Sequence, residues 1–204
     1  MAKITAIAAQ EKDKNRCNLF IDGEFCLALP IDTVLDYRLK VGDEIAEDKL
    51  REIRLEGDKA FALKKAVAYV GAGMKTKKQV ITYLRRKELS DNAVFYAIDK
   101  LKEYGLIDDE EYAKRYIETC SKTNGKKLAS FKLMEKGVSK DVIEKAYEDV
   151  NPLGKENAKA LAERRLHNKE ITKELLQKTY RYLLSRGFSY EEVEYAISSV
   201  KGEN

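Results

Sequence analysis

Three copies of one short motif decide the architecture of this chain: LRRKELS (residues 84–90), LMEKGVS (133–139) and LLSRGFS (183–189). Each copy begins with leucine and ends with a cation, a glycine or glutamate, an apolar residue and a serine. The closing serines, Ser90, Ser139 and Ser189, lie 49 and 50 residues apart. Internal repeats at such a period are typical of stacked supersecondary units.

The chemistry of the motif predicts a tight connection between two helices. Gly137 and Gly187 can take the left-handed conformation that ends a helix. The serine then caps the next helix by accepting a hydrogen bond from a free backbone N–H. The first copy has Glu88 in place of the glycine, which costs on the order of 1 kcal/mol, so a different turn is expected there. Each apolar residue before a serine is expected to pack, as a hydrophobic staple, on the residue that lies four positions after that serine, in the pairs Leu89–Val94, Val138–Ile143 and Phe188–Val193.

The helical period continues on both sides of each motif. Residues four and seven after each serine are apolar, which places them on one helix face. Further helices are expected upstream, at about 58–71, 108–122 and 155–167, the second capped by a box formed by Asp108 and Glu111. The chain is therefore predicted to be mainly α, with three tandem three-helix repeats forming an elongated curved body, preceded by a small β-rich N-terminal module. The predicted boundaries are 1–56 for the module and 57–107, 108–150 and 151–204 for the repeats.

The first 56 residues alternate with period two, which is typical of strands. Ile4, Ala6 and Ala8 are expected on one face of a strand and Ile7 on the other. Two apolar runs flank Asp22-Gly23, a strong signal for a hairpin with a type I′ turn. Short helices are expected at about 30–37 and 47–55. The module either caps the apolar end of the helical array or binds a partner.

Charge alternates along the helical region, although the whole chain carries only +4. Residues 57–90 hold nine cations and two acids, and residues 126–140 hold five cations and one acid. This alternation has two interpretations: a solvated surface, or a basic stripe formed by the middle helices for an acidic protein groove or a nucleic-acid backbone. The candidate partner-binding residues are Lys75, Lys77, Lys78, Arg85, Arg86, Lys126, Lys127, Lys132, Lys136, Lys173 and Arg181.

Catalytic and metal chemistry is not expected. The sequence has one histidine, His167, and three cysteines without CxxC spacing, Cys17, Cys26 and Cys120. These give neither a metal-ligand set nor a nucleophile with its base, so no cofactor is predicted. Unpaired thiols and the lack of a signal or membrane-spanning pattern indicate a cytoplasmic protein. Most of the twelve tyrosines are expected at the edges of the core.

Three longer strings resemble the RecX family of RecA regulators: YGLIDDEEYAKRYI (104–117), NGKKLASFKLMEKGVSKDVI (124–143) and YLLSRGFSYEEVEYAI (182–197). The family pattern of glycine, basic residues, leucine and Lys-Gly-apolar is matched by Gly125, Lys126, Lys127, Leu133, Lys136, Gly137 and Val138. The similarity covers about residues 57–200, and the N-terminal module is similar to an extension of Gram-positive members. Residues 73–76 and Ala129-Ser130 depart from the pattern.

The resemblance implies a monomeric, non-enzymatic regulator that lies in the groove of the RecA–DNA filament. It would modulate RecA recombinase and co-protease activity in recombination, DNA repair and the SOS response, with inhibition the expected direction and support left open. The alternative is a helical-repeat protein that binds single- or double-stranded DNA directly, weakly and with a steep salt dependence. No membrane partner is expected.

Overall fold

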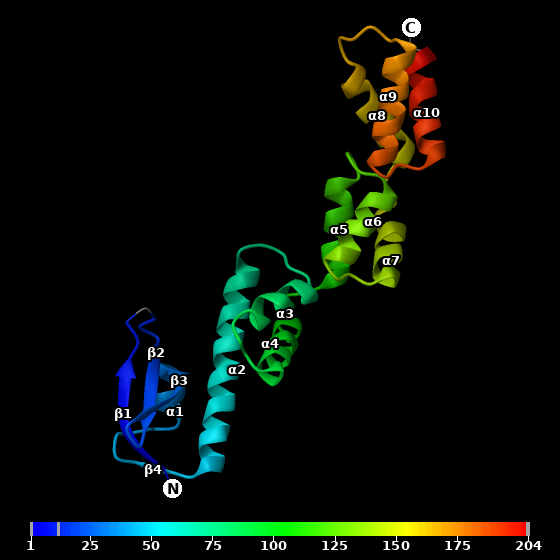
Figure 1. Ribbon diagram of the computed structural model, residues 1–204. Helices are drawn as coiled ribbons and strands as arrows, with labels where there is room; N and C mark the ends of the chain where they lie inside the picture. Colours follow the sequence, from blue (N-terminus) through cyan, green and yellow to red (C-terminus); the bar gives the residue numbers. More distant parts are fainter. Residues whose placement is uncertain (1, 12, 203–204) are drawn as a thin grey trace. The chain divides into compact units, whose positions relative to one another are not determined.

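The computed structural model describes residues 2–11 and 13–202 and divides into two compact units (Figure 1). The first comprises the residues up to Met74 together with Val80–Ile107. The second comprises Lys75–Gln79 and the residues from Asp108 onward. The chain is mainly helical with a small antiparallel sheet, which confirms the predicted fold class. Over the described residues, no helix is both long and apolar enough to cross a membrane.

The sheet has the strand order β3-β2-β1-β4, with β1 at Ala2–Ala9, β2 at Arg16–Ile21, β3 at Glu24–Pro30 and β4 at Glu44–Ile45. The hairpin between β2 and β3 is confirmed, because Asp22 and Gly23 both have positive φ, 51° and 90°. The predicted alternation in β1 is wrong at one point. The register shifts between Ile4 and Ala6, so Ile7 packs against the same core cluster as Ile4. A β-bulge inserts one residue and thereby exchanges the two faces of the strand.

Helix α1 (Ile31–Asp36) lies between β3 and β4 in the chain, and α2 (Glu47–Gly71) follows β4 and packs on β3 as one continuous helix. The sequence predicted two helices in this region, separated near Gly57. Gly57 is instead a buried helical residue, where a Cβ would lie 2.6 Å from the Leu29 side chain. The glycine permits close approach of α2 to β3 rather than breaking the helix.

The remaining helices form the three groups that the repeats predicted. Helix α2 packs with α3 (Lys77–Arg85) and α4 (Asp91–Glu103) around one core cluster. A second cluster joins α5 (Asp109–Cys120), α6 (Lys126–Glu135) and α7 (Lys140–Val150). A third joins α8 (Gly154–Leu166), α9 (Lys173–Ser185) and α10 (Tyr190–Gly202). Both partners of each predicted staple belong to the same cluster.

The motif forms the turn that its chemistry predicts. Gly137 and Gly187 have φ of 90° and 84°. Each closing serine accepts a hydrogen bond from the backbone N–H three residues on, at 3.4, 3.4 and 3.2 Å for Ser90, Ser139 and Ser189. Ser189 also donates its backbone N–H to Glu192 at 2.7 Å, which completes a capping box.

The first motif takes the same turn despite its glutamate, contrary to the expectation of a different one. Glu88 is exposed and has φ of 57°. The helix-ending geometry is therefore kept. The backbone of Glu88 is strained, because a non-glycine residue stands in the left-handed conformation.

Replacing Glu88 by glycine is expected to stabilise the first unit by about 0.5–1 kcal/mol. Relief of left-handed strain outweighs the greater chain entropy of an unfolded glycine. Urea denaturation checks this, with Glu88→Ala as the control that removes the charge and keeps the strain. A Glu88→Gly midpoint at or below that of Glu88→Ala would contradict the strain argument.

Candidate partner-binding surface

The repeats of the second unit meet through the motif turns. Helix α6 begins at Gly125 without a side-chain cap. Two backbone donors at this helix start are satisfied by the turn after α9: the N–H of Gly125 donates to the Arg186 carbonyl at 2.9 Å, and that of Lys127 donates to the Gly187 carbonyl at 3.2 Å. Gly187 is buried here, and a Cβ on it would overlap the backbone nitrogen of Leu128. Gly187 therefore both ends α9 and permits close approach of the start of α6.

A second contact of the same kind joins Lys75–Gln79 to the turn after α6. The Thr76 hydroxyl donates to the Lys136 carbonyl at 2.6 Å, and Lys78 Nζ donates to the Glu135 carbonyl at 3.2 Å. A Cβ on Gly137 would overlap the Lys78 side chain. Two of the predicted binding residues, Lys78 and Lys136, thus lie at this contact within the second unit.

The other candidates of the first repeat differ in their surroundings. Arg85 pairs with Asp91 Oδ1, at 3.3 Å from Nε and 3.1 Å from Nη2. Lys75 is half-buried, and Lys77 and Arg86 are exposed. Lys77 opens helix α3, and its backbone N–H donates to Asp109 at 2.8 Å. Arg85 is therefore partly neutralised, whereas Lys77 presents its charge to solvent.

In the second repeat, Lys126 and Lys127 form the exposed first turn of α6. Lys126 Nζ lies 5.0 Å from the centre of the Tyr147 ring, a cation–π contact. Lys132 and Lys136 are half-buried. The pair at the start of α6 is the most accessible part of the predicted set in this repeat.

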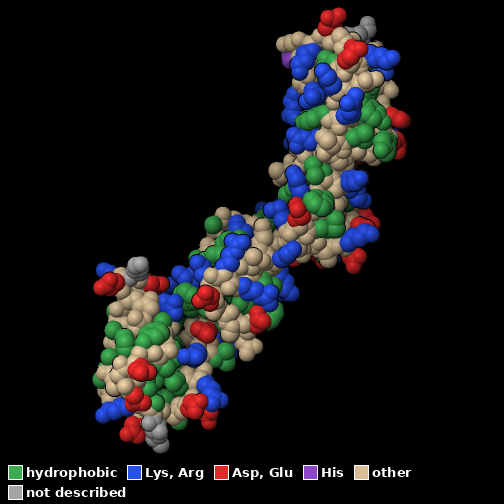
Figure 2. Space-filling model, viewed as in Figure 1, with side chains coloured by type: hydrophobic (Ala, Val, Ile, Leu, Met, Phe, Trp, Pro, Cys, Tyr) green, Lys and Arg blue, Asp and Glu red, His purple; other side chains and the backbone are tan. Residues whose placement is uncertain are grey.

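In the third repeat, the structure brings Lys173 and Arg181 together on the rim of one groove beside α9. Figure 2 shows Lys and Arg side chains gathered over this repeat with hydrophobic side chains between them. Lys201 lies on the same rim and was missed. Residues 189–204 carry four acids and one cation, so a net charge for this segment conceals Lys201, four residues after the buried Ile197. A single stripe that joins all three repeats stays a prediction.

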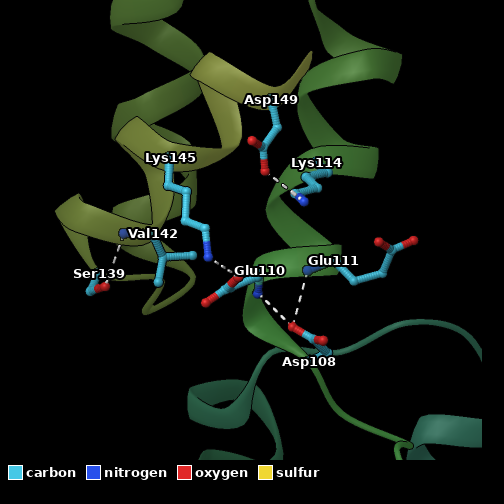
Figure 3. A network of polar contacts seen from close by, with 8 residues as sticks. All are labelled: Asp108, Glu110, Glu111, Lys114, Ser139, Val142, Lys145 and Asp149. Carbon is cyan, nitrogen blue, oxygen red and sulfur yellow. Dashed lines mark hydrogen bonds and ion pairs between the residues drawn. The ribbon is translucent and has the colours of Figure 1, made fainter.

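Other cations of the second repeat serve its packing (Figure 3). Lys114 Nζ lies 2.6 Å from Asp149 Oδ2, and Lys145 Nζ lies 2.9 Å from Glu110 Oε2, so both pairs tie α5 to α7. The hydrogen bond with Asp149 raises the pKa of Lys114 and lowers that of the carboxyl group. Lys114 and Lys145 are therefore ion-paired within the second repeat.

The predicted cap of α5 is formed by Asp108 (Figure 3). Its carboxylate accepts from the backbone N–H groups of Glu110 and Glu111, at 2.8 and 3.1 Å. The Glu111 carboxylate accepts from Arg115 Nε at 2.6 Å. The helix start is therefore fixed by Asp108, while Glu111 forms a pair along the helix.

Titratable side chains of the second repeat include a thiol and a tyrosine that pack in the same core cluster, Cys120 and Tyr147. Over residues 2–11 and 13–202, no group of three or more histidine, cysteine or acidic residues could hold a metal ion. Burial raises the pKa of the Cys120 thiol, which keeps it protonated and a poor nucleophile. Tyr147 is buried in the core, and burial raises its pKa as well.

Four models of RecX domains match the chain. The regulatory protein RecX N-terminal domain matches residues 2–46. The first, second and third three-helix domains of RecX match residues 62–101, 108–146 and 155–197. The N-terminal sheet and all three helical groups are thus similar to parts of one family.

Individual relatives agree with these models. A regulatory protein RecX of Clostridium botulinum (strain Alaska E43) is 33% identical over 151 residues, which cover 74% of this chain and 71% of that protein. One of Staphylococcus aureus (strain JH9) is 34% identical over 146 residues, covering 71% and 54%. A crystal structure of a regulatory protein RecX aligns with a TM-score of 0.67 at 27% identity, covering 96% of this chain and 98% of that one. The chain belongs to the RecX family of regulatory proteins.

Proposed function

We propose that this chain binds the RecA–DNA filament and modulates RecA recombinase and co-protease activity, with inhibition the expected direction. It acts as a binding protein without catalysis, as a cytoplasmic monomer in recombination and DNA repair. Family membership supports the class of function. The surface of the repeats supports the mode of action.

The observation that carries the proposal is a lysine repeated at the start of each middle helix: Lys77 in α3, Lys127 in α6 and Lys173 in α9. All three are exposed. The first turn of a helix favours acidic side chains, because the helix dipole is positive there. The first turns of α3 and α6 contain no acidic residue, and that of α9 contains Glu174 beside Lys173. Helix stability therefore does not account for these lysines, whereas recognition of anionic groups does.

Repetition also suits a filament as the target. A protein with several similar weak contacts gains avidity when its partner repeats, since each further contact forms at high effective concentration. On naked DNA, exposed lysines would contact mainly the phosphates. For about five phosphate contacts, affinity for DNA alone falls roughly 500-fold between 50 and 200 mM salt.

Binding measured with and without RecA separates the two candidate targets. Labelled single-stranded DNA is titrated with the full chain over a salt series, either bare or coated with RecA and a non-hydrolysable ATP analogue. Binding to the coated DNA is expected to persist at physiological salt, where binding to bare DNA is lost. Tight binding to bare DNA at that salt, unaltered by RecA, would favour the direct DNA-binding alternative.

A further inference from the structure

The groove of the third repeat has a regular helical construction. It encloses about 820 Å³ beside α9 and is lined along that helix by Lys173, Leu176, Tyr180 and Arg181, among others. These residues follow the i, i+3, i+7, i+8 spacing of one helix face. Lys173 and Arg181 are eight residues apart, about 12 Å along the axis, so the groove is about two helical turns long.

The floor of the groove is apolar. Leu176 and Tyr180 are half-buried and pack against the core cluster of the third repeat, and Ile171 lies beside them. Ile197 of α10 contributes from the neighbouring helix and is 8% exposed. Apolar surface that remains open between two helices is the usual receptor for the apolar face of a third.

The rim of the groove has one sign of charge. Every charged side chain that the structure places in its lining is a cation: Lys173, Arg181 and Lys201. All three are exposed. They come from both walls, two from α9 and one from α10. An apolar floor between cations complements an apolar ligand that carries carboxylates on its flanks.

We propose that this groove is a docking site for a short acidic amphipathic segment of a partner protein, bound as a helix of about two turns or more. Its apolar face would lie on Leu176, Tyr180 and Ile197, and its carboxylates would pair with Lys173, Arg181 and Lys201. The groove would recognise the peptide by its apolar face and its carboxylates. This proposal does not depend on RecA being the target of the protein.

Two designed peptides of about 14 residues, roughly four helical turns, test the site. One has leucines on one face with glutamates beside them, and the other has lysine in place of every glutamate. Each carries a fluorescent label and is titrated with the full chain while anisotropy is measured. The glutamate peptide is expected to bind and the lysine peptide to show no binding.

A matched pair of double variants locates the contact. Lys173→Glu with Arg181→Glu reverses two rim charges. Lys178→Glu with Arg164→Glu makes the same change of charge at exposed positions of the same repeat that do not line the groove. The rim variant is expected to weaken binding of the glutamate peptide roughly tenfold or more, because two attractive pairs become repulsive. The control variant is expected to bind within about twofold of the unmodified chain.

Three outcomes would overturn the proposal: equal binding of both peptides, no binding of the glutamate peptide, or equal loss in the two variants. Sedimentation of the chain alone adds a fourth. A dimer that the rim variant dissociates would show that the groove is occupied by a second copy. The RecA assays are independent of these readouts, so either proposal can fail while the other holds.

Discussion

Gly187→Ala is expected to destabilise the second unit by about 2–5 kcal/mol. The left-handed conformation, with φ of 84°, costs a non-glycine residue about 1–2 kcal/mol. The added methyl group would also lie 2.6 Å from Leu128 Cβ and overlap the Leu128 backbone, and such overpacking costs about 1–3 kcal/mol more. The neighbour is backbone at the start of α6, so it cannot rotate away.

Gly105→Ala is the matched control for this change. Gly105 also has positive φ, 65°, directly after a helix, but a Cβ there would meet no atom within 4 Å. The Gly105→Ala variant is expected to lose only the free energy that the left-handed conformation costs a non-glycine residue, about 1–2 kcal/mol. Urea denaturation followed by circular dichroism compares the two variants. Equal losses would show that the turn after α9 does not hold the start of α6 in place.

Lys126→Glu with Lys127→Glu is expected to raise the concentration needed for half-maximal RecA regulation roughly tenfold or more. Both lysines are exposed at the start of α6, where acidic side chains suit the helix dipole better than cations. The variant should therefore keep its melting temperature, apart from the small loss of the contact between Lys126 and Tyr147.

Lys122→Glu with Lys140→Glu serves as its control. It makes the same change of charge in the same repeat, and Lys140 likewise stands in the first turn of a helix, α7. The control is expected to regulate RecA like the unmodified chain. If both variants regulate normally, the start of α6 is a solvated surface and the contact lies elsewhere.

The motif turns could be predicted from sequence because their causes are local. A glycine that ends a helix and a serine that caps the next act within a few residues, and Gly187, Ser189 and Glu192 take the expected roles. The turn at Glu88 shows the limit of the local rule. Gly137 and Gly187 also lie in close contact with Lys78 and Leu128, where a Cβ would overlap them. Glu88 is exposed, so its side chain meets no such overlap.

The features that the sequence did not predict depend on contacts between distant residues. From sequence alone, Gly57 is interpreted as a helix breaker. The structure shows that it allows α2 to pack closely against the Leu29 side chain. The bulge between Ile4 and Ala6 arises from pairing with β2 and leaves no mark in the hydrophobic pattern. Lys201 joins Lys173 and Arg181 only because α10 packs beside α9. Sums of charge along the chain cannot reveal such a rim.

Hydrolysis of ATP by RecA on single-stranded DNA tests the central claim most directly. The full chain is added in increasing amounts to preformed filaments, and the rate of hydrolysis is followed. The rate is expected to change at much less than one molecule of this protein per RecA protomer, and to fall if regulation is inhibitory. An unchanged rate at every ratio up to equimolar would contradict the proposed function.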